Sequence, residues 1–196
     1  MNKAARIALS SFVLGIAGIG TSQGALIDRG GGLIYDDVLN VTWLQDASFV
    51  QTSGYNSFGR LTRPEAQSFA DDLVYHDSVR DVDYDDWRLP TTVNDFSSVG
   101  YDIDGSNSEL AFMFYVNLGY SAIPEHTAAA PLPTSDAYNP FINIAYRGYW
   151  SGTPTNRASQ GWIVHYHFGS TEITDVSDAQ RVWLLRNGDV GVPEPG

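Results

Sequence analysis

Residues 84–91, with the sequence YDDWRLPT, change from charged to apolar side chains and then reach a proline within eight positions. Trp87 and Leu89 are two residues apart, so in a strand they share one face while Arg88 points to the other. Pro90 has no amide hydrogen to donate to a sheet and therefore ends the strand. This stretch predicts a strand that enters the core, and we take it as the element around which the domain is built.

Helical patterns lie on both sides of this strand. Residues 62–65 have the S/T-x-x-E form of a capping box, and the apolar stripe that follows predicts a helix ending near Tyr75. Residues 106–109 form a second box of the same kind, which opens a helix that Gly119 ends. Because this second helix is apolar nearly all round, we expect it to be buried on more than one side.

Three other regions have the composition of strands. Residues 33–36 and 41–44 are rich in β-branched and aromatic residues on either side of a turn, which predicts a β-hairpin. Residues 161–169 alternate between an apolar face and a face with two histidines, which predicts a half-buried strand. We interpret those histidines as exposed or hydrogen-bonded, because no third metal ligand can be predicted near them. Residues 181–186 are apolar on both faces and predict a central strand.

The first 24 residues have the pattern of a signal peptide. Lys3 and Arg6 precede an apolar run over residues 7–19, and small residues follow it. The run is shorter than the roughly 20 apolar residues that span a bilayer. We therefore expect residues 1–24 to be removed on export, so that the mature chain begins near Ala25.

The charge of the mature chain limits the classes of partner that it can bind, and its cysteine content limits how the fold can be stabilised. Loss of Lys3 and Arg6 moves the formal net charge from −12 to −14 and leaves arginines as the only fixed cations. Nucleic acids and anionic membrane surfaces both need a basic patch, so we expect neither as a partner. The chain has no cysteine, and an exported domain of this kind has to be held by its core without disulfides.

Residues 102–109 place oxygen-bearing side chains around a glycine, an arrangement that resembles a calcium loop. The candidate Ca²⁺ ligands are Asp102, Asp104, Asn107 and Glu109. The spacing departs from an EF-hand, because the glycine is fourth and the closing carboxylate comes too early. Capping of the second helix is the competing role for the same segment, and the two roles are compatible.

Residues 122–140 contain four prolines and follow no period, which predicts a long irregular loop. Aromatic residues crowd the end of this loop, where their rings could stack on a sugar. The candidate ligand-binding residues are Tyr138, Tyr146, Tyr149 and Trp150. Packing in the core is the alternative role for these rings.

The order of these features resembles that of one family. A capped helix, WRLPT at 87–91, a second helix start, YWSG at 149–152 and VWLLR at 182–186 follow one another as in the Lcl-type C-terminal domain of bacterial collagen-like adhesins. That domain is related to the C-type-lectin-like fold. The resemblance covers residues 25–190. It implies an α+β fold in which two helices pack on a mostly antiparallel, twisted sheet and a long irregular loop holds the ligand.

The last residues resemble a second known feature. VPEP at 192–195 is similar to the opening of a PEP-CTERM sorting signal, so we interpret residues 191–196 as the truncated start of one. If the signal is completed by a hydrophobic helix and a basic cluster, the resemblance implies an exosortase sorting machinery as a partner. A proline-rich linker is the alternative interpretation.

The family resemblance implies a non-catalytic cell-surface or extracellular-matrix module that binds a glycan or exopolysaccharide, in adhesion or in a biofilm. The sulfated polysaccharides associated with Lcl-type domains would need an arginine-rich face, and the charge of −14 argues against them here. The alternatives are a structural matrix protein without a specific ligand and, third, a hydrolase. The chain lacks the cysteine that sulfatase-modifying enzymes of the lectin-like fold use, and GYWSG at 148–152 is not the G-x-S-x-G elbow.

Overall fold

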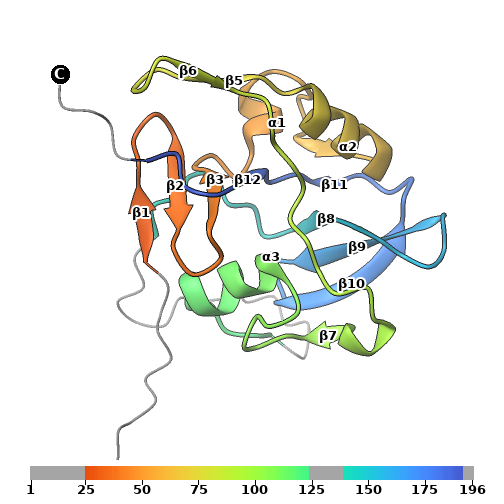
Figure 1. The fold of residues 1–196 in the computed structure, drawn as a ribbon. Helices are drawn as coiled ribbons and strands as arrows, with labels where there is room; N and C mark the ends of the chain where they lie inside the picture. Colours follow the sequence, from red (N-terminus) through yellow and green to blue (C-terminus); the bar gives the residue numbers. More distant parts are fainter. Residues whose placement is uncertain (1–24, 124–138, 192–196) are drawn as a thin grey trace, which may run out of the picture.

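The N-terminal sheet is built on the hairpin that the sequence predicts. The computed structural model describes residues 25–123 and 139–191. Two strands pair antiparallel across a turn in which Asn40 takes a left-handed φ of 52°. An edge strand and a strand from the end of the domain complete a four-stranded sheet (Figure 1). In spatial order the strands are β1 (Leu26–Asp28), β2 (Leu33–Asp36), β3 (Val41–Leu44) and β12 (Leu185–Asn187).

A second sheet has six strands. In spatial order they are β4 (Arg60–Leu61), β11 (Gln180–Arg181), β8 (Gly148–Pro154), β9 (Gln160–His165), β10 (Ser170–Asp175) and β7 (Gly100–Tyr101). Its neighbours pair antiparallel except β11 and β8, which pair in parallel. A separate hairpin consists of β5 (Tyr75–Asp77) and β6 (Val82–Tyr84). The fold is α+β and mostly antiparallel, as predicted, but the strands form two sheets and a hairpin rather than one sheet.

Short helices connect and cover the sheets. They are α1 (Phe49–Thr52), α2 (Arg63–Asp72), the 3-10 turn η1 (Phe96–Ser98), α3 (Glu109–Phe112) and the π-helical turn η2 (Met113–Asn117) that continues α3. The capping box of α2 is confirmed, because the Thr62 N–H donates to Glu65 Oε2 over 2.8 Å. α2 ends at Asp72, before the predicted Tyr75, because Tyr75 already belongs to β5. Across the described residues, no helix has the length and apolar character needed to cross a bilayer.

The second predicted capping box is wrong by two residues. Ser108, not Ser106, precedes α3, and its Oγ accepts a hydrogen bond of 3.3 Å from the Ala111 N–H. Glu109 does not reach back along the helix, because its carboxylate binds the Arg88 guanidinium through two hydrogen bonds of 2.8 Å. Glu109 therefore does not complete a capping box, because its carboxylate binds Arg88, which lies 21 residues away in the sequence.

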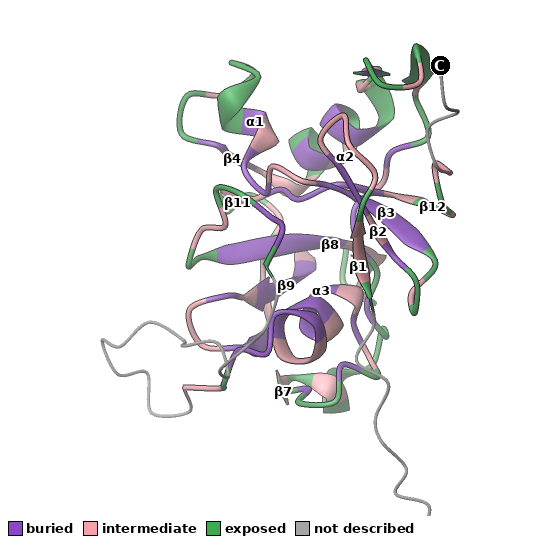
Figure 2. Cartoon of the chain, turned by 90° about the vertical axis from the view of Figure 1, so that its left-hand side faces the viewer, coloured by how far each residue is buried: buried purple, intermediate pink, exposed green. Residues whose placement is uncertain are grey.

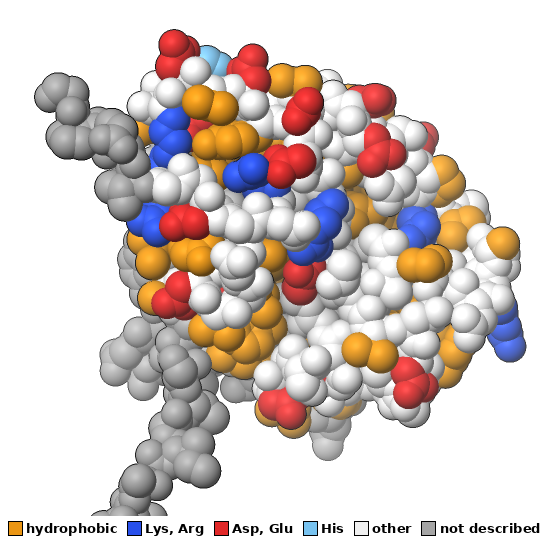
Figure 3. Space-filling model, viewed as in Figure 1, with side chains coloured by type: hydrophobic (Ala, Val, Ile, Leu, Met, Phe, Trp, Pro, Cys, Tyr) orange, Lys and Arg blue, Asp and Glu red, His pale blue; other side chains and the backbone are white. Residues whose placement is uncertain are grey.

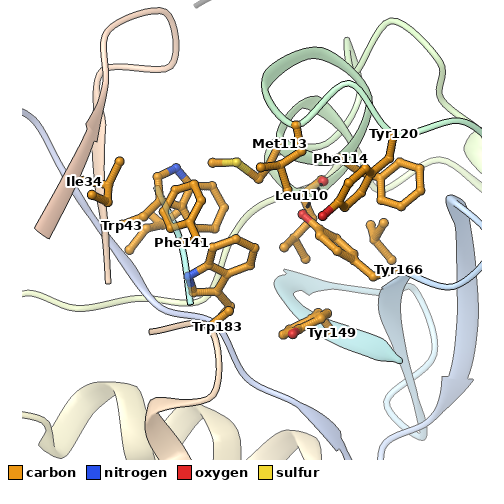
Figure 4. Packing of buried hydrophobic residues seen from close by; sticks show 14 of the residues in the cluster. Ile34, Trp43, Leu110, Met113, Phe114, Tyr120, Phe141, Tyr149, Tyr166 and Trp183 are labelled. Atoms are coloured by element: carbon orange, nitrogen blue, oxygen red, sulfur yellow. Dashed lines mark hydrogen bonds between the residues drawn. The ribbon is translucent and has the colours of Figure 1, made fainter. Parts of the chain in front are cut away.

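Two hydrophobic clusters lie on opposite faces of β8 and β9. Figure 2 shows α2 on one side of β8 and α3 on the other. The α2-side cluster includes Phe69, Trp87, Leu89, Trp150, Ile163 and Leu184. The α3-side cluster includes Trp43, Phe114, Tyr149, Val164, Tyr166 and Trp183, and Figure 4 shows how its rings interlock. Consecutive residues of a strand point to opposite faces, so each strand contributes to both clusters.

These two clusters correct the prediction of a half-buried strand at residues 161–169. β9 ends at His165, and Trp162, Ile163 and Val164 are each no more than 3% exposed. Ile163 packs in the α2-side cluster and Val164 in the α3-side cluster. Alternation along a sequence shows which residues share a face, but not whether the other face is also covered.

Residues 181–186 form a crossing between the two sheets rather than one central strand. β11 ends at Arg181 in the six-stranded sheet, and β12 begins at Leu185 in the four-stranded sheet. Residues 182–185 are each no more than 2% exposed, and they alternate between the two clusters. The predicted burial is confirmed. The predicted single strand is wrong, because the chain leaves one ladder before it joins the other.

The WRLPT stretch runs beside this crossing. Trp87 and Leu89 are 4% and 2% exposed and share the α2-side cluster, as their spacing predicts. Only Arg88 pairs as a strand residue would, through backbone hydrogen bonds of 2.8 and 3.1 Å with Leu185. Since the Arg88 side chain binds Glu109 at the start of α3, this stretch connects the α2-side cluster to the helix on the other side.

Candidate binding site

An open cleft of about 1060 Å³ lies beside α3 and η2. One wall runs from η1 through β7 to the loop before α3, and the other is the outer face of α3 and η2; Figure 1 shows these elements at the end of the domain away from β5 and β6. The side chains that define its chemistry are Tyr101, Asp102, Ile103, Asp104, Phe112 and Tyr115. We call this surface the acidic cleft.

The loop at residues 102–107 folds tightly against α3 because of one glycine. Gly105 has a φ of +65°, and its amide donates a 2.9 Å hydrogen bond to Asp102 O. A Cβ atom at position 105 would lie 2.3 Å from the Phe112 Cα atom. Only glycine meets both requirements, so the position of this wall depends on it.

The two aspartates of this loop differ in burial and in charge. Asp102 is 6% exposed, and its two oxygens accept hydrogen bonds of 3.0 and 3.1 Å from the backbone and side chain of Asn107. Burial raises the pKa of Asp102, and the nearby Asp104 carboxylate adds to that rise. The Ser106 N–H donates to Asp104 Oδ1 over 3.0 Å and lowers the pKa of Asp104. The cleft therefore presents Asp104 to solvent as a stable negative charge.

The opposite wall of the cleft is apolar and partly exposed. Phe112, Tyr115 and Val116 line it from α3 and η2. The Tyr115 hydroxyl donates to Gly169 O over 2.8 Å, and burial raises the pKa of Tyr115 well above its ordinary value. The sequence predicts a helix buried on more than one side; the structure uses one of its apolar faces as a cleft wall.

Tyr101 and Ile103 form the rim of the cleft. They are 37% and 67% exposed. Tyr101 lies on β7, where it pairs with Ser170 of β10, so a sheet edge holds its backbone in place. The Tyr101 ring and the Asp104 carboxylate line the same cleft, so it offers both a stacking surface and a hydrogen-bond acceptor.

The four residues predicted to ligate Ca²⁺ do not form one site. Asp102, Asp104 and Asn107 line the acidic cleft, whereas the Glu109 carboxylate binds the Arg88 guanidinium and accepts a 2.6 Å hydrogen bond from the Thr91 N–H. Within residues 25–123 and 139–191, no group of three or more His, Cys, Asp or Glu side chains could hold a metal ion. Ca²⁺ takes about six to eight oxygen ligands, so the remaining two carboxylates and one amide are a poor set.

The predicted sugar-stacking aromatics have different positions. Tyr138 lies outside the described residues. Tyr149 and Trp150 are fully buried, in the α3-side and α2-side clusters respectively, so the prediction that they contact a ligand is corrected. The Trp150 indole donates to Leu61 O over 2.7 Å, which satisfies its polar atom inside the core. Tyr146 is 43% exposed and is the one described member of this set that can meet a ligand.

Tyr146 belongs to a second, smaller pocket of about 520 Å³, which we call the basic pocket. Its polar lining consists of Tyr146, Arg147, His165, His167 and Arg181. Arg181 donates to Gln51 Oε1 over 3.1 Å, and the two imidazole rings lie 6.4 Å apart. The exposed Arg147 makes no ion pair with another described residue.

Several other arginines are already neutralised by acids. Bidentate or close pairs join Arg29 to Asp189, Arg80 to Asp77, Arg88 to Glu109 and Arg186 to Asp86. Figure 3 shows blue and red side chains next to one another on the face that it draws. In the basic pocket, by contrast, neither Arg147 nor Arg181 forms such a pair with another described residue.

Sequence reasoning missed two residues of the acidic cleft, Tyr101 and Tyr115. The sequence carries a signal for each. Tyr101 directly precedes the acidic loop, and Tyr115 belongs to the apolar excess of the second helix. What the sequence does not show is that β7 and η2 bring the two tyrosines to the same cleft.

The fold and the cleft together define an α+β module with an open surface site. The family model of the Lcl C-terminal domain matches residues 32–186, and the chain belongs to this family. That membership indicates a surface or adhesion-type module. Neither a curated protein nor a solved structure matches the chain.

Proposed function

We propose that this chain is an exported, non-catalytic surface module that binds polysaccharide in the acidic cleft, and that its fold is C-type-lectin-like. The observation that carries the proposal is the pairing of an exposed aromatic rim, Tyr101, with the ionised Asp104 on one open cleft. Sugar rings present C–H faces that pack on aromatic rings and hydroxyls that donate to carboxylates. A cleft open to solvent suits a long chain that enters and leaves at both ends.

The negative charge of the acidic cleft should determine which polysaccharides, anionic or not, can bind there. Asp102 and Asp104 line it, and none of the described residues that line it is an arginine or a histidine. A sulfated or uronic-acid polymer would meet like charge there, which costs free energy. We therefore propose a neutral polysaccharide, or one with amino sugars, as the ligand of the acidic cleft.

The position of the cleft suits display from a surface. Figures 1 and 2 both place β7, which lies on one wall of the cleft, well away from β12, the last strand of the domain. If residues 192–195 open a PEP-CTERM signal, as their sequence suggests, a tether beyond Gly191 would leave the cleft facing outward. Processing by an exosortase and a place in a biofilm matrix belong to the same proposal.

The experiment is a glycan array probed with the mature chain and with three variants. Tyr101→Ala and Asp104→Asn should each lower binding of neutral or amino-sugar polysaccharides by about tenfold, which corresponds to roughly 1.4 kcal/mol. Tyr146→Ala is the matched control, because it removes an equally exposed tyrosine from the other pocket. A loss of binding in the control with none in the cleft variants would contradict the assignment to the acidic cleft.

One observation favours a second candidate, the binding of an acidic polysaccharide in the basic pocket. Arg147 is exposed there and forms no ion pair with another described residue, and the Tyr146 ring lines the same pocket. In that case Arg147→Ala and Tyr146→Ala would abolish binding of sulfated or carboxylated glycans, and added salt would weaken it. If no glycan class gave a binding signal on the array, the result would instead favour a structural matrix protein without a specific ligand.

A further inference from the structure

Ala25 is held on the turn between β2 and β3 by two hydrogen bonds. Its backbone nitrogen lies 2.7 Å from Asp37 Oδ1, and its carbonyl oxygen accepts from the Asp37 N–H over 3.3 Å. The next residue, Leu26, pairs with Asp36 at the start of β1. Ala25 is therefore attached to the first sheet at the turn between β2 and β3.

The Asp37 carboxylate that bonds to Ala25 pairs with no cationic side chain among residues 25–123 and 139–191. Asp37 is exposed and forms no ion pair with any Arg or His of the described chain. Its neighbour Asp36 is fully buried, and the Asp37 charge is one of the causes that raise the pKa of Asp36, after burial itself. Two adjacent carboxylates on one turn would be stabilised by a positive charge at the position of the Ala25 nitrogen.

We propose that the bond between Gly24 and Ala25 is the processing site, and that the new α-ammonium group of Ala25 forms an ion pair with Asp37. A signal peptidase would break the peptide C–N bond with water, which adds a hydroxyl to the Gly24 carbonyl carbon and a hydrogen to the Ala25 nitrogen. The free amine binds a proton at neutral pH, because its ordinary pKa is about 7.7–8.0. A neutral amide with one donor thus becomes a cation with three, and its hydrogen bond to Asp37 becomes charge-assisted.

This inference rests on the export part of the proposed function and not on ligand binding. It gives cleavage a consequence for the folded domain: processing adds an ion pair that fastens the edge strand β1 to the hairpin. The precursor, in which residue 25 has an amide nitrogen, cannot form that pair.

The sequence makes a specific chemical test available. Lys3 is the only lysine, so in a chain that begins at Ala25 the α-amine is the only amine that an acetylating reagent can modify. We expect acetylation to lower the melting temperature by about 1–4 °C, the range of an exposed ion pair in a domain of this size. Acetylation should have no effect on Asp37→Asn, and it should keep its full effect on the control Asp72→Asn, which removes an exposed acid from the end of α2.

Two outcomes would overturn the inference. One is an equal response of wild type and Asp37→Asn to acetylation. The other is an intact mass or N-terminal sequence of the exported protein that starts at a residue other than Ala25. Neither outcome would affect binding on the glycan array. An array without any signal would in turn not contradict the ion pair. The experiments therefore test the ion pair and the polysaccharide binding independently.

Discussion

Residues 182–185 lead from β11 into β12, and residues 101–107 lead from β7 towards α3; most of both segments is irregular, yet the first is buried and the second lines an open cleft. Each side chain of 182–185 is at most 2% exposed, and the backbone bonds to β3 and to the WRLPT stretch. Leu184 O accepts from the Leu44 N–H over 3.0 Å, and the Trp183 indole donates to Leu44 O over 2.8 Å. This segment is satisfied by residues that are distant in the sequence.

The acidic side chains of residues 102–107 accept their hydrogen bonds from within the loop itself. Asp102 bonds to Asn107 and Asp104 to Ser106, while Tyr101 and Ile103 face solvent. A loop that closes its own hydrogen bonds can carry exposed side chains without loosening the core. We therefore expect substitutions at residues 182–185 to affect stability and substitutions in the acidic cleft to affect ligand binding.

The largest effect should come from the crossing. Trp183 is fully buried, with Trp43 at 5.0 Å and Phe141 at 4.8 Å between ring centroids, so Trp183→Ala should cost about 3–5 kcal/mol of unfolding free energy. Trp87→Ala, in the other cluster, should cost a similar amount. Chemical denaturation measures both, with the 71%-exposed Phe58→Ala as a control that should change little. A mild effect at both tryptophans would contradict the central role of this region.

Loss of the ion pair between Arg88, which pairs with Leu185, and Glu109, at the start of α3, should have an intermediate effect on stability. Glu109→Gln removes the charge that binds Arg88 at the start of α3, and should cost about 1–3 kcal/mol because the guanidinium loses a charged acceptor in a mostly buried position. Glu65→Gln is the matched control, since a glutamine can also complete the capping box of α2. Equal denaturation midpoints for the two variants would show that the Arg88 pair adds nothing to stability.

The variant Asp36→Asn tests whether a buried carboxylate in the first sheet stabilises the fold. Burial raises its pKa, so its contribution to stability is full at low pH, below the ordinary value, and is lost as the pH rises through the raised value. At neutral pH, Asp36→Asn should therefore melt at a temperature equal to or above that of wild type. The buried Oδ1 of its neighbour Asn117 has no hydrogen-bond partner among the described residues, and an amide at position 36 could satisfy it.

The melting temperatures of Asp36→Asn and wild type should converge as the pH falls, because Asp36 then becomes neutral in wild type as well. Melts from pH 7 to pH 4 measure this difference without the contribution of other acids, which are common to both proteins. A variant that is less stable at pH 7 would show that the charged form of Asp36 is required.

The smallest effect should be that of Ca²⁺ on the acidic cleft. A site with a Kd of about 1 mM would add about 1.4 kcal/mol at about 10 mM Ca²⁺. We expect less than this, because Glu109 is bound to Arg88 and cannot join Asp102 and Asp104. Calorimetric melts of wild type and Asp104→Ala in CaCl₂, MgCl₂ and chelator measure it. A rise specific to Ca²⁺ and lost in Asp104→Ala would restore the calcium site.

The sequence by itself determined the local elements of this protein. The hairpin at 33–44, the capping box at 62–65 and the burial of Trp87, Leu89 and residues 182–185 all follow from residue preferences and from periods of 2 and 3.6. These features depend on neighbours in the chain, which a single sequence displays. The acidic loop with its glycine was also visible, and three of its four predicted ligands do share one cleft.

Only the tertiary structure decided which of these side chains meet solvent. Tyr149 and Tyr146 are three residues apart, yet one is fully buried and the other is 43% exposed, because α3 covers the face to which Tyr149 points. The sequence leaves Glu109 free to cap its own helix, but the fold brings Arg88 to it. Tyr101 and Tyr115 line one cleft only because the fold brings β7 and η2 to it. Burial and pairing depend on what packs from distant parts of the chain, and no local pattern contains that information.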